Sequence, residues 1–134
     1  MASVDFTSWV VPDLKLTLGG VTYEVAPPDV ERAKMILALT VREELRLGLS
    51  KGDLPEQLKT IIENAVSDRQ LGEITLGPDA YERMVTDRVA VTTIERMAYY
   101  AMLFWARGQE RADAIASALW APKDDIDSGD DSGE

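Results

Sequence analysis

The chain has 134 residues, 46% of them hydrophobic, and its 24 acidic and 14 basic residues give a net charge of −10, with neither histidine nor cysteine. The commonest general base, the best nucleophile and the softest metal ligands are thus absent, so we expect no enzyme activity, cofactor or metal. This length favours one domain, the acidic balance disfavours nucleic-acid binding, and no apolar run reaches the ~20 residues that a membrane span requires.

The first elements predicted along the chain are two strands joined by a tight turn. Residues 1–6 have neither a basic segment nor a long apolar core, so we expect no secretory signal and an intracellular protein. In residues 14–25, LKLTLGGVTYEV, apolar and polar residues alternate, and Gly19-Gly20 suits a two-residue type I′ turn. A lone hairpin is marginal in water, so its apolar side is expected to pack on helices. The predicted pairs are Leu14 with Val25, Lys15 with Glu24, Leu16 with Tyr23, Thr17 with Thr22, and Leu18 with Val21.

Helical periodicity predicts five helices after the hairpin, at about residues 29–47, 55–69, 79–87, 92–107 and 109–120. Asp29 is a candidate N-cap, Gly48 a C-terminal stop, and Pro55 stands at a tolerated first-turn position. Thr92 followed by Glu95 is a capping-box pattern that indicates a fresh helix start. The fold class predicted is α+β and predominantly helical, with an N-terminal hairpin packed on a bundle of four to five helices.

The last twelve residues, Lys123–Glu134, carry six acidic residues and one lysine, which is half of the net charge. Such a composition is typical of disorder. We therefore predict one domain over residues 1–122 and a disordered acidic tail over 123–134, with solubility as the plain meaning of the acidic excess.

Two pairs of adjacent carboxylates suggest a site for a hard cation, Glu43-Glu44 and Asp124-Asp125. Neither pair lies in a calcium loop with its oxygen spacing, so we interpret both as solvated charge. The sequence also lacks a Gly-x-Ser-x-Gly elbow, a phosphate loop and a dinucleotide fingerprint. No catalytic or metal residue is predicted.

The ten residues from Met97 to Ala106 contain no charge and lie in a helical pattern that is apolar almost all round. Such a helix must be enclosed by its own domain or by a partner. Its aromatic residues therefore form either core or interface, and tyrosine and tryptophan are enriched at interfaces. The predicted partner-binding residues are Tyr99, Tyr100, Phe104, Trp105 and Trp120.

Dispersed hydrophobic and glycine positions give the chain a resemblance to a known family. The positions in the C-terminal half are Leu76-Gly77, Tyr81, Met84, Asp87, Val89, Phe104-Trp105, Gly108, Ala112 and Trp120. Together with a Leu-x-Leu-Gly-Gly-x-x-Tyr hairpin followed by Pro-Pro, they resemble the tail assembly chaperones of long-tailed phages and prophages of actinobacteria. The likeness covers about residues 12–122. One departure is Asp87-Arg88-Val89, where similar proteins often have Asp-Gly-Val.

The resemblance implies that the protein binds the tape measure protein, keeps it soluble and extended, and helps to recruit major tail (tube) protein subunits. It would act in the bacterial host cytoplasm during virus assembly and be absent from the mature virion. In many such phages a programmed frameshift adds a second domain, and this chain would be the unshifted product. Copies arrayed along one client would touch, so a weak homo-oligomer is expected.

The alternative is an acidic regulatory or DNA-mimic protein that binds a basic partner protein. Its support is the net charge alone. The two hypotheses differ in salt response, because binding between opposite charges weakens steeply with salt whereas binding through apolar grooves persists.

Overall fold

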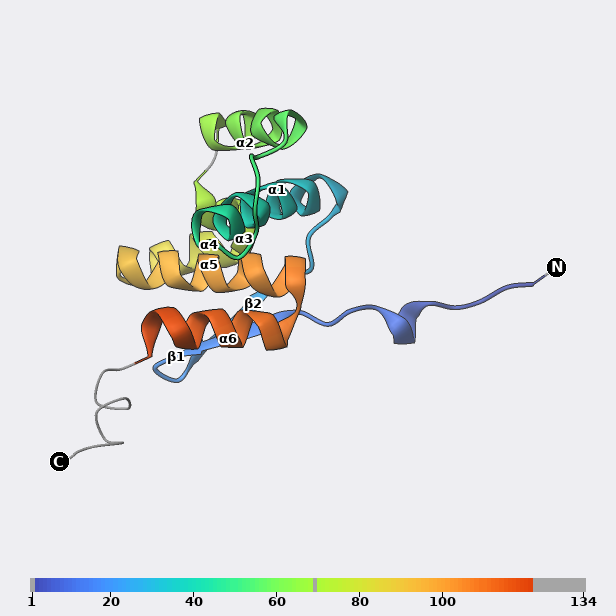
Figure 1. Ribbon diagram of the computed structural model, residues 1–134. Coiled ribbons are helices and arrows are strands. Elements are labelled where there is room, and N and C mark those ends of the chain that lie inside the picture. The colour runs from blue at the N-terminus through green and yellow to red at the C-terminus, as the bar shows by residue number, and fades with distance from the viewer. Residues whose placement is uncertain (1, 69, 122–134) are drawn as a thin grey trace, which may run out of the picture.

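The computed structural model describes residues 2–68 and 70–121, and Figure 1 shows it as a ribbon. Within this part of the chain an antiparallel two-stranded hairpin is followed by six α-helices, so the predicted fold class, α+β and predominantly helical, is confirmed. The predicted disordered tail lies outside the described residues. The elements are the 3₁₀ helix η1 (Thr7–Trp9), β1 (Leu14–Leu18), β2 (Val21–Val25), α1 (Val30–Arg46), α2 (Glu56–Asp68), α3 (Leu71–Leu76), α4 (Pro78–Thr86), α5 (Val91–Arg107) and α6 (Gln109–Trp120).

The hairpin has the predicted register at all five pairs. Gly19 and Gly20 have φ values of 57° and 85°, as a type I′ turn requires. Tyr23 and Val25 are buried, whereas the residues beside the turn are about two-fifths exposed. The open end of the hairpin therefore packs on the helices, as expected from its apolar side, and the turn projects from them.

Tyr23 fastens the hairpin to α4. Its hydroxyl donates a hydrogen bond of 2.8 Å to Oδ2 of Asp87, which raises the pKa of Tyr23. The guanidinium of Arg83 lies over the Tyr23 ring, 5.2 Å from its centroid. One tyrosine thus joins strand and helix through its hydroxyl and its ring face.

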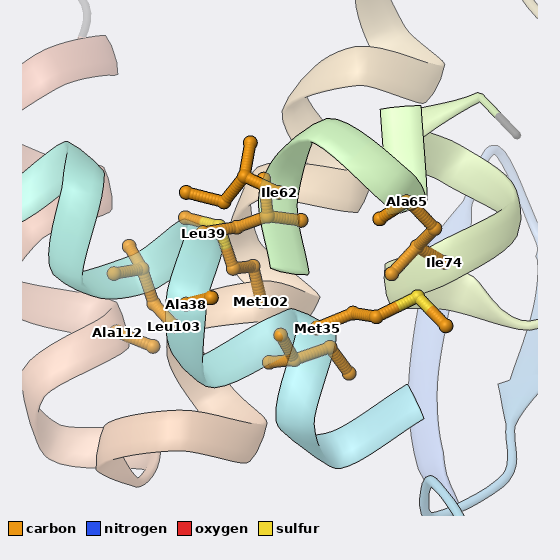
Figure 2. Close-up of a cluster of buried hydrophobic side chains, with 10 residues drawn as sticks. Met35, Ala38, Leu39, Ile62, Ala65, Ile74, Met102, Leu103 and Ala112 are labelled. Carbon is orange, nitrogen blue, oxygen red and sulfur yellow. The ribbon is translucent and has the colours of Figure 1, made fainter. Parts of the chain in front are cut away.

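The helix α5 belongs to both hydrophobic clusters of the protein. Its first half packs with β2 and α4, through buried Ile94, Ala98 and Ala101. Its second half contributes Met102 and Leu103 to a cluster in which side chains of α1, α2, α3 and α6 converge, as Figure 2 shows. The charge-free segment therefore runs through the middle of the molecule (Figure 1).

The five predicted helix ranges each coincide with a helix to within one residue at each end. Asp29 caps α1, since its carboxylate accepts a hydrogen bond from the Arg32 amide, and Gly48 follows α1 with a positive φ of 79°. The capping box predicted at Thr92 is wrong. The N-cap of α5 is Ala90, which makes no side-chain cap. A capping box occurs instead at Gln70 and Glu73, at the start of α3.

The helix α3 was not predicted, because its six residues are too short to show a helical period. It is held by close packing, and a Cβ atom added at buried Gly72 would lie 2.4 Å from Cδ1 of Tyr81. Only glycine therefore allows the Tyr81 ring of α4 to lie against the backbone of α3.

We expect Gly72→Ala to destabilise the protein by about 1–2 kcal/mol in urea unfolding. The steric cost of overpacking exceeds the roughly 1 kcal/mol that alanine gains over glycine within a helix. In a Tyr81→Ala background the same change should be neutral or stabilising. A similar loss in both backgrounds would contradict the proposed clash.

Arg88 has a φ of 60° and is the one described non-glycine residue with a positive φ. It follows the end of α4, where the amides of Arg88 and Val89 bond back to the carbonyls of Val85 and Met84. This geometry favours glycine. It gives a physical reason for the glycine that the resembling proteins often carry at this position.

Arg88→Gly should raise the free energy of unfolding by about 0.5–1 kcal/mol, because relief of the left-handed conformation outweighs the added freedom of the unfolded chain. Arg88→Ala is the control, since it removes the same exposed side chain but keeps the unfavourable φ. Equal effects of the two variants in urea unfolding would show that the side chain, not the backbone, is responsible.

Candidate functional site

The five predicted partner-binding residues lie on two adjacent helices and are all half-buried. Trp120 ends α6 and meets the Tyr99 ring edge-on, with the centroids 5.9 Å apart. The Arg96 guanidinium lies 5.6 Å from the centroid of Trp120. The structure thus brings together the ends of the predicted set, one from each helix.

Phe104 and Trp105 are half-buried and pack against the core cluster of Figure 2, as Tyr99 and Tyr100 also do. The rings of Phe104 and Trp105 meet edge to face with their centroids 4.9 Å apart. The Trp105 indole nitrogen is buried and has no hydrogen-bond partner among the described residues. These aromatic side chains therefore contribute to the core as well as to the surface.

Tyr99 borders a groove between α3, α4 and α5, which we call the α4–α5 groove. It encloses about 430 Å³ and its lining includes Tyr81, Val85, Val91 and Tyr99. Val85 and Val91 are 51% and 68% exposed. The groove is therefore mostly apolar, with exposed valines at its rim and with Gln70 and Glu95 as polar members of its lining.

Nothing in the sequence pattern marks Val85 or Val91 as an interaction residue. Val85 lies within the predicted helix of residues 79–87, and Val91 lies just before the predicted helix start at residue 92. Their exposure depends on how α4 is turned against α5, which the sequence pattern alone does not specify.

Trp120 and Tyr99 also border a second hollow at the junction of α5 and α6. It encloses about 340 Å³, and its lining also includes Leu119, Glu95 and Arg96. Tyr99 and Glu95 are thus shared by both hollows, so an aromatic and a charged side chain stand between them.

Glu43 and Glu44 are buried, so their interpretation as solvated charge is wrong. Glu44 accepts two hydrogen bonds from Arg107, each 2.8 Å long, and these lower its pKa. Glu43 accepts from Arg46 and from the Tyr99 hydroxyl, the latter at 3.3 Å. Both carboxylates therefore join α1 to α5 rather than facing water or a cation.

The tyrosines of α5 are held in the protonated form. Burial and a hydrogen bond donated to Asp113 raise the pKa of Tyr100 to about 12. Burial, followed by the charge of Glu43, raises the pKa of Tyr99. Their hydroxyls thus serve as fixed donors that orient the rings beside the grooves.

Among the described residues there is no cluster of three or more acidic side chains that could hold a metal ion. The pair Asp124-Asp125 lies outside the described residues. None of the helices in this part of the chain is both long enough and apolar enough to cross a membrane.

The fold and its grooves define a small α+β domain with an open apolar surface around one central helix. A family model described as a domain of unknown function (DUF7426) matches residues 4–133, and the chain belongs to this family. No curated protein and no solved structure matches the chain.

The ion pair between Glu44 and Arg107 holds α1 against α5, the helix that carries the candidate binding surface, and its contribution to stability can be tested. Glu44→Gln keeps the side chain's size but removes the charge, and we expect a loss of about 1.5–3 kcal/mol at pH 7. Because the pKa of Glu44 is lowered by folding, this stabilisation is present above the unfolded pKa and disappears as pH falls through the folded value.

Urea unfolding from pH 7 to pH 3 measures the effect, and the difference between wild type and variant should shrink below about pH 4. Glu63→Gln, at an exposed site on α2, is the matched control and should change little. A difference that is the same at every pH would contradict the ion pair as its source.

Proposed function

We propose that the protein is a tail assembly chaperone of a long-tailed phage or prophage, in its shorter, unshifted form. It binds and solubilises the tape measure protein, helps to recruit tail-tube subunits in the host cytoplasm, and leaves before the virion is mature. The observation that carries the proposal is the α4–α5 groove, whose apolar rim stays exposed at Val85 and Val91. The sequence resemblance supplies the client.

The groove suits a helical client. An amphipathic helix docks by placing apolar residues spaced at i, i+3, i+4 and i+7 into a groove between helices. Val85, Val91 and Tyr99 offer such apolar contacts in the α4–α5 groove, and Glu95 beside them offers one charged contact. A tape measure protein, long and prone to aggregate, presents client segments of this kind.

The acidic regulatory or DNA-mimic alternative gains less support from the described residues. Glu43 and Glu44 are occupied by arginines of the same chain, and Asp113 accepts from Tyr100. Carboxylates used in this way are not arrayed for an external basic partner. The two functions still predict opposite salt responses, which the experiment below uses.

We expect Val85→Asp/Val91→Asp to weaken client binding by at least about tenfold, because burying each valine contributes about 1 kcal/mol or more. The test is co-expression with the tape measure protein of the same genome, followed by co-purification at low and high salt. Val30→Asp is the control, since Val30 is 73% exposed but stands on α1, away from the groove.

Client that becomes soluble and stays bound at high salt, and is lost only with the groove variant, supports the chaperone function. Binding that disappears at high salt with the wild type supports the acidic-mimic alternative instead. If the client precipitates with this chain, the experiment is repeated with the frameshifted longer product. Precipitation there too would overturn the proposal.

A further inference from the structure

Residues 2–13 contain apolar side chains that the body of the protein does not cover. Residues 2–13 are exposed throughout and run away from the body as an extended segment (Figure 1), which we call the arm. Five large hydrophobic residues of the arm are 59–67% exposed, namely Val4, Phe6, Trp9, Val10 and Val11. A contiguous set of this kind marks an interaction segment rather than ordinary surface.

The arm has local structure that holds its two aromatic residues together. Asp5 accepts hydrogen bonds from the amide and the hydroxyl of Thr7, at 2.9 and 2.6 Å. The turn η1 then sets Phe6 edge-on against Trp9, with centroids 5.1 Å apart. The pair is therefore preformed, and a partner that binds it has less conformational entropy to remove.

A groove elsewhere on the same molecule matches the arm. It lies between β1, α5 and α6 and encloses about 420 Å³, and we call it the β1–α5–α6 groove. Leu16, Met97, Tyr100, Ala116 and Trp120 contribute to its lining. Its volume lies in the range of about 300–1,000 Å³ that accommodates ligand-sized apolar groups.

The charges of arm and groove are complementary. The arm carries Asp5 and Asp13 and no lysine or arginine. The described lining of the groove includes Lys15 and Arg96 and no acidic residue, in a chain whose net charge is −10. A segment with acidic residues and aromatic anchors is thus the occupant that this groove fits.

We propose that the arm of one copy docks in the β1–α5–α6 groove of a second copy. With nine extended residues and the three-residue turn η1, the arm reaches about 35 Å, far enough to span to a neighbour, and in Figure 1 it points away from its own body. Each copy has one arm and one groove, so the contact is head-to-tail and builds an open chain of copies or a ring. This inference does not depend on the proposed function.

The test uses two variants of the full chain and sedimentation velocity over a wide range of concentration. Phe6→Ser/Trp9→Ser disables the arm, and Ala116→Arg fills the groove. We expect the wild type to associate as concentration rises and each variant alone to stay monomeric. A mixture of the two should form a dimer that neither forms alone, because one supplies an intact groove and the other an intact arm.

The controls match each change. Val30→Ser removes an exposed apolar residue outside the arm, and Ser117→Arg adds the same charge at an exposed neighbouring position of α6. Both should associate like the wild type. Circular dichroism and thermal unfolding verify that each variant is folded.

A second measurement keeps the test decisive if Ala116→Arg does not fold. A fluorescein-labelled peptide of residues 2–13 is titrated into the arm variant and followed by anisotropy, with the same peptide carrying serine at positions 6 and 9 as control. Binding of the first peptide alone supports the proposal. A wild type that stays monomeric, an arm variant that associates unchanged, or a peptide that fails to bind would each overturn it.

Discussion

A helix that is apolar around most of its circumference persists in water only when its neighbours cover it, and α5 imposes this constraint on the whole domain. Its first half is covered by the hairpin and α4, and its second half by α1 and α6, with α2 packed outside on α1. The short helix α3 supplies Ile74 to one cluster and Leu76 to the other, so it joins the two around α5. The elements in contact with α5 are thus placed by the face of α5 that they cover.

Carboxylates, in turn, fix the elements around α5. Glu44 binds Arg107 at the end of α5 and lies 3.7 Å from Arg111 of α6, so one buried side chain of α1 holds the junction of two later helices. Asp87 receives the Tyr23 hydroxyl and Asp113 that of Tyr100. Part of the acidic excess therefore serves as hydrogen-bond acceptors for arginine and tyrosine within the fold. Hydrogen bonds to charged groups have preferred directions, so they fix the relative orientation of the elements more tightly than apolar packing alone does.

The features predictable from the sequence are those that depend on near neighbours in the chain. The hairpin register follows from a period of two and a Gly-Gly turn, and the long helices from apolar spacing. The features that were missed have two causes. Burial of Glu44 requires Arg107, 63 positions away, and α3 has only six residues, too few to show a helical period. For the candidate site, the sequence predicted the aromatic residues but left core and interface as alternatives. In the structure Tyr99 and Tyr100 do both, since they pack against the core and also border grooves.

Two groups of exposed apolar residues carry the proposed contacts, and they lie at grooves that differ in position and in charge. One lines the α4–α5 groove, and the other pairs the arm with the cationic β1–α5–α6 groove. Trp120 stands between them, bordering the hollow shared with Tyr99 on one side and the arm's groove on the other. Under the two proposals, one groove holds the arm of a neighbouring copy while the other stays free for the client. Both grooves take part of their lining from α5, with Tyr99 in one and Tyr100 in the other, so both proposed contacts depend on the position of that one helix.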